Sequence, residues 1–261
     1  MTTTEAPLLI ERSNGLATLT LNRPGQYNAL SEDLLDALEH AFAGLAKDED
    51  IHCVVLRGAG KAFCAGHDLK QMRAQPERGY YQDLFSQCGR LMQAIVNHPV
   101  PVIARVHGMA TAAGCQLVAS CDLAVAAESA RFAVSGINVG LFCSTPAVAL
   151  TRAMPIKKAF EMLITGHFIS AQEAADNGLV NRAVPDDALD AALDALVQAI
   201  MAKSPVAIRT GKAMYQRQAG LGLQDAYAYA SDVMAGNMMA RDACEGIDAF
   251  IEKRAPRWTG R

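Results

Sequence analysis

Residues 97–122 read NHPVPVIARVHGMATAAGCQLVASCD, and this stretch decides the fold. Pro99 ends the helical pattern that precedes it, because proline lacks the amide proton that a continuing helix needs. PVIARVHG then forms the nearly continuous apolar run that is typical of a strand buried on both faces. The small residues from Thr111 to Gly114 predict a turn that opens a short helix, and a new strand pattern starts at Asp122. The stretch therefore reads strand, turn, short helix, strand.

The same unit recurs along the chain about every 45–50 residues, which predicts a coiled stack of similar turns. The order of elements alone also allows a doubly wound sheet. Further strands are expected at residues 8–12, 15–21, 51–58, 122–129, 131–134 and 180–184. Helices are expected at 31–48 with Ser31 as N-cap, 80–98, 144–154, 156–166, 170–179 with a Ser170–Glu173 capping box, and through most of 186–254.

Composition narrows the class of protein. The chain has 261 residues, 51% hydrophobic and 20% charged, enough for one large domain or one domain with a smaller appendage. The net charge of −3 and the lack of a basic tract argue against a nucleic-acid partner. No apolar run approaches the roughly 20 residues that span a bilayer, so no membrane association is expected. MTTTEAPLLIER lacks the pattern of a signal peptide, and we expect a cytoplasmic protein.

The seven cysteines are odd in number and scattered through apolar runs, which indicates reduced thiols. No CxxC pair and no His-x-x-x-His spacing occurs, so no metal site is expected.

Met234, Met238 and Met239 lie in the helical C-terminal part, where they either pack in a core or contact another subunit.

Two loops built from small residues follow buried strands: CAGHDLK at residues 64–70 and MATAAGCQL at residues 109–117. Small side chains let a ligand approach the main chain closely. Main-chain amides at the start of a short helix favour developing negative charge, so two such loops side by side could form an oxyanion hole. Tight packing without function explains the same pattern.

The signatures of a phosphate loop, a dinucleotide fold and a serine nucleophile elbow do not occur in the sequence.

Five segments follow one another along the chain: LNRPGQYNAL (21–30), GKAFCAGHDLK (60–70), the block 97–122, ISAQEAADNGLVNRAV (169–184) and GIDAFIEKR (246–254). Together they resemble the crotonase, or enoyl-CoA hydratase/isomerase, superfamily. The resemblance covers essentially the whole chain. It implies an α/β spiral of ββα turns over residues 1–200, which carries an acyl-CoA site, and a helical trimerisation region over residues 201–261. Homotrimers, or hexamers made of two trimers, are therefore expected.

The resemblance also implies the site. Coenzyme A enters as part of a thioester substrate, with no permanently bound cofactor, and the thioester carbonyl lies between the backbone N–H groups of His67 and Ala113. The stretch His67, Asp68, Leu69 and Lys70 is expected along the CoA. Arg23 either touches CoA or orders the first loop, and Phe250 and Lys253 match residues that contact CoA, in some relatives from a neighbouring subunit.

The chain departs from the family pattern at both glutamates that carry out hydration of a 2-enoyl thioester. Gln116 and Gly136 occupy those two positions. A neutral amide has no useful pKa for general base catalysis, and glycine offers no side chain. We therefore expect the nominal hydratase activity, conversion of 2-enoyl-CoA to 3-hydroxyacyl-CoA in fatty-acid metabolism, to be weak or absent.

Three functions remain open at this point. The first is oxyanion-hole chemistry on a CoA thioester other than hydration. The second is weak hydration, in which Gln116 only orients water, and the third is non-catalytic binding of acyl-CoA. Ser135, Asn138, Cys143, Ser144 and Thr145 either supply replacement chemistry or serve packing and capping. Asp68 and Asp122 are expected as caps and loop anchors, and His107 as a satisfied core histidine.

Overall fold

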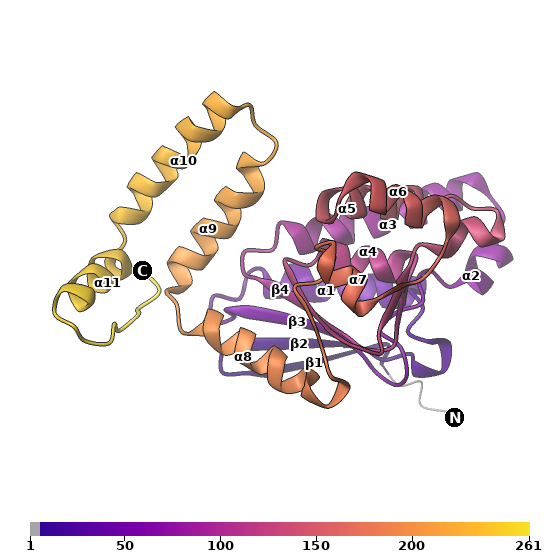
Figure 1. The fold of residues 1–261 in the computed structure, drawn as a ribbon, viewed down its shortest axis with the longest axis horizontal. Coiled ribbons are helices and arrows are strands. Elements are labelled where there is room, and N and C mark those ends of the chain that lie inside the picture. Colours follow the sequence, from indigo (N-terminus) through magenta and orange to yellow (C-terminus); the bar gives the residue numbers. More distant parts are fainter. Residues whose placement is uncertain (1–5) are drawn as a thin grey trace.

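The computed structural model describes residues 6–261, in which two sheets form the centre of the main body (Figure 1). The larger sheet has the order β1-β2-β3-β4-β6-β9 and the smaller one the order β5-β7-β8. The strands are β1 Leu8–Ser13, β2 Leu16–Leu21, β3 Cys53–Gly58, β4 Val102–Val106, β5 Met109–Thr111, β6 Leu123–Ala127, β7 Arg131–Ala133, β8 Ile169–Ser170 and β9 Arg182–Val184. In the larger sheet, β1 and β2 form the expected antiparallel hairpin and the other neighbours pair in parallel.

Between β4 and β7 the chain coils, because successive strands there alternate between the two sheets. β4 belongs to the larger sheet and β5 to the smaller; after helix α4 (Ala113–Ser120), β6 returns to the larger sheet and β7 to the smaller. The predicted coiled stack of turns is confirmed, and the doubly wound alternative is wrong. β5 and β8, with three and two residues, are not predicted as strands from the sequence.

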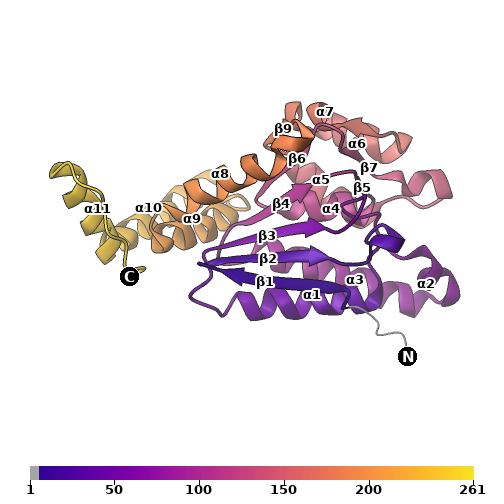
Figure 2. The ribbon, with the colours of Figure 1, turned by 90° about the horizontal axis from the view of Figure 1, so that it is seen from below.

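The surroundings of β3 explain why its sequence is apolar without alternation. Val54 and Leu56 belong to the main core together with residues of α1 (Glu32–Leu45) and α3 (Arg78–Val96). Cys53 and Val55 point to the opposite face, where they pack with Leu193 of α8 (Leu189–Met201). Figure 2 shows α1 and α3 on one side of the larger sheet and α8 on the other. Successive side chains of a strand alternate faces, so a strand that is covered on both faces is apolar throughout.

The remaining helices are α2 Leu69–Ala74, α5 Ser144–Ala153, α6 Ile156–Thr165, α7 Ala171–Asp176, α9 Pro205–Gln218, α10 Leu223–Met238 and α11 Arg241–Ile251, with short 3₁₀ helices η1 Pro24–Gln26, η2 Ser135–Val139 and η3 Asp186–Ala188. α2 lies in a segment that the sequence pattern assigns to a loop. Its six residues are too few to show helical periodicity, although the Asp68 cap that starts it is visible in the sequence.

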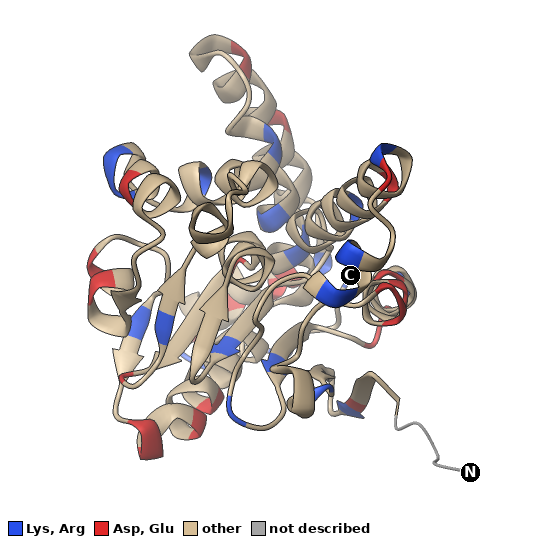
Figure 3. Ribbon diagram, turned by 90° about the vertical axis from the view of Figure 1, so that its right-hand side faces the viewer, with Lys and Arg blue, Asp and Glu red and all other residues tan. Residues whose placement is uncertain are grey.

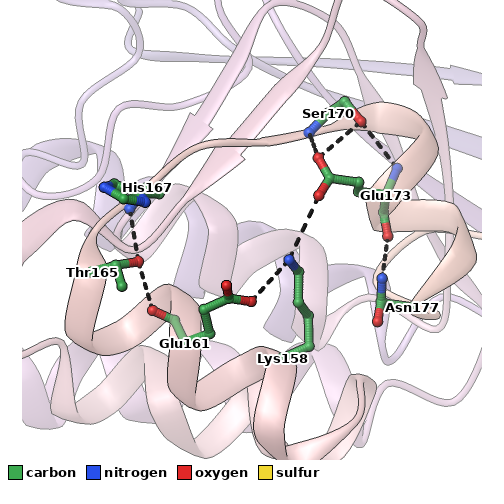
Figure 4. Close-up of polar contacts among 7 residues, drawn as sticks. All are labelled: Lys158, Glu161, Thr165, His167, Ser170, Glu173 and Asn177. Carbon is green, nitrogen blue, oxygen red and sulfur yellow. Dashed lines mark hydrogen bonds and ion pairs between the residues drawn. The ribbon is translucent and has the colours of Figure 1, made fainter.

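Two predicted helix starts are confirmed. The Ser31 Oγ accepts a hydrogen bond from the Leu34 N–H at 3.3 Å. The Ser170 hydroxyl accepts from the Glu173 N–H at 3.1 Å, and the Glu173 carboxylate accepts from the Ser170 N–H at 3.0 Å, which completes the capping box (Figure 4). Lys158 lies 3.0 Å from a Glu161 oxygen and 3.6 Å from a Glu173 oxygen, so it connects α6 to the start of α7.

Helices α9, α10 and α11 lie to one side of the body (Figures 1 and 2). No residue of α10 is buried, and in α9 no residue is buried as a whole, although the side chain of Lys212 is. Met234 is 71% exposed and Met239 83%, so within one chain the core-packing interpretation of these methionines is wrong. The predicted boundary between residues 200 and 201 falls at the end of α8 and stays a prediction.

No single helix among residues 6–261 is long and apolar enough to cross a membrane. The segments Asp186–Met201 and Pro205–Gln218 reach that length only together, with a bend of 101° between them. Basic and acidic residues are interspersed along the ribbon (Figure 3).

Lys212 ties α9 to the body. Its Nζ lies 2.6 Å from Asp122 Oδ2 and donates to the carbonyls of Ile95 and Val100, and its side chain is only 7% exposed. Asp122 also accepts from the Val102 N–H at 2.8 Å, which confirms the predicted anchor. Burial raises the pKa of Asp122 despite the opposing Lys212 charge, and burial lowers the pKa of Lys212. The pair is therefore a costly buried contact that stabilises only while both partners remain.

Candidate active site

The two small-residue loops touch each other. A Cβ on Gly66 would lie 2.9 Å from the Ala112 Cβ and 3.2 Å from the Ala113 nitrogen. A Cβ on Gly114 would lie 2.1 Å from the Cys64 carbonyl oxygen. Real Cβ contacts are essentially never shorter than 3.0 Å, so glycine is required at both positions. Gly66 also has φ +92°, a conformation that side chains disfavour.

The backbone leaves the His67 N–H free. The Leu30 N–H donates to the Gly66 carbonyl at 2.8 Å, and the Asp68 N–H donates to the Leu30 carbonyl at 3.1 Å. In this parallel pairing the N–H of His67 itself points away from Leu30. Within residues 6–261 this N–H donates to no acceptor.

Ala113 is the first residue of α4, where an N–H has no partner inside the helix. Ala112 before it has φ +49° and ψ −120°, an unusual conformation for a residue with a side chain, and its N–H donates to the Ala133 carbonyl at 2.9 Å. Such strain costs about 1–3 kcal/mol and clusters at functional sites. Two N–H donors therefore lie free on adjoining loops, one of them at the positive end of a helix dipole.

The imidazole of His67 is unusual because neither ring nitrogen has a hydrogen-bond partner in the described part of the chain. Both nitrogens are buried, and the ring packs edge-on against Phe85 of α3 at 5.5 Å between centroids. Burial lowers the pKa of His67 from 6.5 to about 4. The ring is therefore neutral at pH 7.

We expect the stability of the protein to fall between pH 6.5 and 4. In this range the unfolded chain protonates His67 and the folded chain does not, so the unfolded state gains protons and stability drops by up to about 3 kcal/mol. His67→Phe should remove this part of the pH dependence, as measured by urea unfolding at several pH values. Equal pH dependence in wild type and variant would contradict the shift.

Gln116 lies one turn after Ala113 on α4 and is 3% exposed. Its side-chain oxygen Oε1 is buried and has no hydrogen-bond partner among the described residues. The notable feature is an uncharged acceptor held without a donor, at the position where the family pattern has a glutamate. Such a group costs free energy unless water or a ligand satisfies it.

The space beside Gly136 is occupied by the protein itself. A Cβ at this position would lie 2.6 Å from the Leu141 carbonyl oxygen and 2.7 Å from the Cys143 Sγ. No side chain, and so no glutamate, fits there unless the backbone of residues 141–143 moves. Burial raises the pKa of Cys143, with the Gly136 N–H opposing, so the thiol is neutral and a weak nucleophile.

The other polar residues near this loop have local partners. Asn138 Nδ2 donates to the Gly166 carbonyl at 3.4 Å, and the Ser144 hydroxyl donates to the Phe142 carbonyl at 3.4 Å. Ser135 and Thr145 are half-buried. Nothing in these contacts activates a nucleophile, which favours the packing and capping interpretation.

Arg23 and Asp68 join the loop after β2 (residues 22–31) to the small-residue loop 64–70. Arg23 donates to the Ala29 carbonyl at 2.6 Å and to Asp68 Oδ2 at 3.1 Å, so it orders the loop. The Asp68 carboxylate also accepts from the N–H groups of Lys70 and Gln71, as the predicted cap of α2. Burial alone would raise the pKa of Asp68, but Arg23 and these N–H groups outweigh it and hold the pKa below its usual value.

The residues expected to contact CoA lie in two separate groups, one at the start of α2 and one on and after α11. Leu69 and Lys70 are exposed in the first turn of α2, directly after His67. Phe250 is 85% exposed on α11, and Lys253 follows it. α2 and α11 lie at opposite ends of the molecule in both views, so one chain does not bring these two groups together (Figures 1 and 2).

Four further observations concern the remaining predictions and the surroundings of His67. His107 Nε2 donates to the Gly60 carbonyl at 2.9 Å, so the side chain has a hydrogen-bond partner as expected, but His107 is half-buried, and the expected core position is wrong. All seven cysteines are free. Within residues 6–261, no three His, Cys, Asp or Glu side chains are grouped as metal ligands would be. The aromatic residues around His67 are missed from the sequence, although Tyr81 and Phe85 show helical i, i+4 spacing.

We expect Gly114→Ala to destabilise the protein by about 1–3 kcal/mol or more, because the added methyl overlaps the Cys64 carbonyl. Thermal unfolding measures the effect. Gly89→Ala is the matched control, since its Cβ on α3 would meet nothing within 4 Å, and it should be neutral or slightly stabilising. Equal stability of the two variants would show that the loops are not in close contact.

Residues 11–261 match the enoyl-CoA hydratase/isomerase family. The chain therefore belongs to this family, and the resemblance in its sequence is confirmed. Its relatives include the mouse (Mus musculus) protein named enoyl-CoA hydratase domain-containing protein 3, mitochondrial, which is 45% identical over 248 residues, 95% of this chain and 83% of the relative.

Solved structures agree with the family and the fold. The crystal structure of an enoyl-CoA hydratase from Mycobacterium smegmatis has a TM-score of 0.96 and 59% identity, and the match covers 97% of this chain and 99% of the other. Human enoyl-CoA hydratase domain-containing protein 3 has a TM-score of 0.94 and 43% identity, covering 97% and 100%. The cytoplasmic location expected from the N-terminal residues is wrong by this comparison, because curated relatives from mouse and human are named as mitochondrial.

Proposed function

We propose that this protein binds an acyl-CoA thioester with its carbonyl oxygen between the N–H groups of His67 and Ala113. The observation that carries the proposal is the pair of N–H donors without acceptors in the described chain, on two loops that touch through Gly66. Main-chain donors fixed in this way stabilise an enolate or a tetrahedral oxyanion without reorganisation, which is typically worth several kcal/mol.

We further propose that efficient hydration is not the reaction. The neutral amide of Gln116 cannot act as a general base. At Gly136, where the family pattern has its second glutamate, residues 141–143 fill the space that a side chain would need. The function we favour is thioester chemistry that needs the oxyanion hole but not these two acids, such as hydrolysis or reaction at the α-carbon. Weak hydration is the second candidate, because the buried Gln116 oxygen lacks a donor and a water molecule would supply one. Binding without turnover is the third.

The CoA part of the ligand is proposed to lie along Asp68, Leu69 and Lys70, with Lys70 exposed to meet a phosphate. Coenzyme A is then part of the thioester substrate, and the protein holds no permanently bound cofactor. We also propose homotrimers, or dimers of trimers. The support is a set of strongly exposed apolar residues on and between α10 and α11, which includes Met234, Met239 and Phe250. In such an assembly Phe250 and Lys253 reach the site of a neighbouring subunit.

Calorimetric titration with butyryl-CoA and with free CoA tests the binding proposal, and mass spectrometry of crotonyl-CoA incubations tests the reaction. Saturable binding of butyryl-CoA, stronger than that of free CoA, is expected. Released CoA would favour hydrolysis, slow formation of the 3-hydroxy product that disappears in Gln116→Ala would favour weak hydration, and no product would leave binding alone. No binding of butyryl-CoA at millimolar concentration would contradict the proposal.

A further inference from the structure

Thr111 is a buried polar residue where the two small-residue loops meet. It ends β5 and is 5% exposed. Its hydroxyl donates to the Ala65 carbonyl of loop 64–70 at 3.0 Å. Burial of a hydroxyl costs free energy unless it is hydrogen-bonded, and valine has the same shape without a hydroxyl. The hydrogen bond to Ala65 is therefore what distinguishes threonine from an apolar residue at this position.

The main-chain hydrogen bonds between the two loops end at Thr111. The Cys64 N–H donates to the Met109 carbonyl at 3.1 Å, and the Thr111 N–H donates to the Cys64 carbonyl at 2.9 Å. The next N–H along the chain, that of Ala112, points elsewhere and donates to the Ala133 carbonyl of β7. Within residues 6–261, no main-chain hydrogen bond joins the loops beyond this point. The Thr111 hydroxyl therefore takes the place of a further main-chain bond.

The hydroxyl bond lies equally close, along each chain, to the two free N–H donors. Ala65 precedes His67 by two residues, and Thr111 precedes Ala113 by two residues. A single residue between each pair leaves little main chain that could absorb a shift of one loop against the other. Misplacement of a binding group by about 1 Å is enough to impair a site. The spacing of Ala65 and Thr111 therefore controls the spacing of the two donors.

The other contacts near the site do not duplicate this bond. Arg23 holds loop 64–70 through Asp68, but it does so from the loop after β2. Gly66 and Gly114 leave room for the two loops to approach, and they have no side chain that could bond across the contact. In the described part of the chain, Thr111 makes the only side-chain hydrogen bond between residues 64–70 and residues 109–117.

We propose that Thr111 is a positioning residue for the oxyanion hole. By holding the Ala65 carbonyl, its hydroxyl fixes the spacing and direction of the N–H groups of His67 and Ala113. The inference rests on the proposed binding of a thioester carbonyl by these two groups, and it adds a residue that does not itself touch the ligand. Donors fixed in advance are effective because they do not reorganise when negative charge develops.

Isotope-edited infrared spectroscopy of bound butyryl-CoA, with ¹³C at the thioester carbonyl, tests this inference. Two well-placed donors lower the carbonyl stretching frequency below that of the free ester. Thr111→Val removes the hydroxyl and keeps the shape. We expect it to reduce the frequency shift and to weaken the binding of butyryl-CoA relative to free CoA by about 2–10-fold.

Two further variants separate positioning from stability. Thr111→Ser keeps the hydroxyl and should retain the wild-type frequency shift, although loss of the methyl group lowers the melting temperature. Thr20→Val is the matched control. Thr20 is also buried, at 6% exposed, and its hydroxyl accepts from Arg57 Nε at 2.9 Å within the larger sheet, outside both loops. This variant should retain the shift.

Three results would overturn the inference: an unchanged shift in Thr111→Val, an equal loss in Thr111→Ser, or an equal loss in Thr20→Val. If Thr111→Val does not fold, Thr111→Ala compared with Thr111→Ser gives the same contrast, because only serine keeps the hydroxyl. Failure of the proposed function is distinguishable. In that case wild type itself does not bind butyryl-CoA or shows no shift of the carbonyl frequency.

Discussion

Hydration of crotonyl-CoA by the wild-type protein is expected to be about 10²–10⁴-fold slower for each missing acid–base group than a typical enzyme of this reaction. The reason is that Gln116 is a neutral amide and Gly136 has no side chain. The proposed oxyanion hole would polarise the thioester but would move no proton. Loss of the absorbance of the conjugated thioester measures the rate. Turnover at about 1–10³ s⁻¹ would show that another residue supplies the proton chemistry.

The variants at these two positions are expected to differ. Gln116→Glu places a carboxylate where a buried polar side chain already fits, and it should recover part of the rate. Gly136→Glu should recover nothing and should destabilise the fold, because its Cβ would overlap the Leu141 carbonyl oxygen and the Cys143 Sγ. A gain of activity in Gly136→Glu would mean that the 141–143 loop moves readily.

Lys212→Met is expected to lower the free energy of unfolding by about 3–5 kcal/mol. The substitution leaves the Asp122 carboxylate buried without its partner and frees α9 from the carbonyls of Ile95 and Val100. Urea unfolding measures the loss. The double variant Lys212→Met/Asp122→Asn should recover a part of it, since the unpaired charge is then removed.

Lys158→Met is the matched control for this prediction. Lys158 also forms ion pairs, with Glu161 and Glu173, but both partners are more than half exposed. Exposed pairs contribute about 0–1 kcal/mol, so the control should be nearly neutral. Equal losses in Lys158→Met and Lys212→Met would contradict the account of the buried pair.

The sequence was sufficient to predict the elements whose chemistry is local. Ser31 and Ser170 start helices because their hydroxyls satisfy free N–H groups, and β3 is apolar throughout because both faces are covered. The sequence identifies two loops of small residues that could lie side by side, and the structure shows that Gly66 and Gly114 allow main chain to approach main chain between them.

What the sequence could not show depends on contacts between distant residues. Gly136 is visibly a missing glutamate, but only the structure shows that Leu141 and Cys143 fill the space. α2 is too short to be periodic. The i, i+4 spacing of Met234 and Met238 fits a core as well as an exposed face, and only their exposure decides. The unpartnered ring of His67 follows from three-dimensional packing against Phe85, which no local pattern indicates.

Isotope-edited infrared spectroscopy of bound butyryl-CoA tests the central claim most directly, with ¹³C at the thioester carbonyl. Two N–H donors from His67 and Ala113 should lower the carbonyl stretching frequency below that of the free ester in water. Gly114→Ala, which disturbs the contact between the loops, should weaken this shift. A bound ester whose carbonyl frequency equals that in water would show that the two N–H groups do not hold the thioester, and would contradict the account.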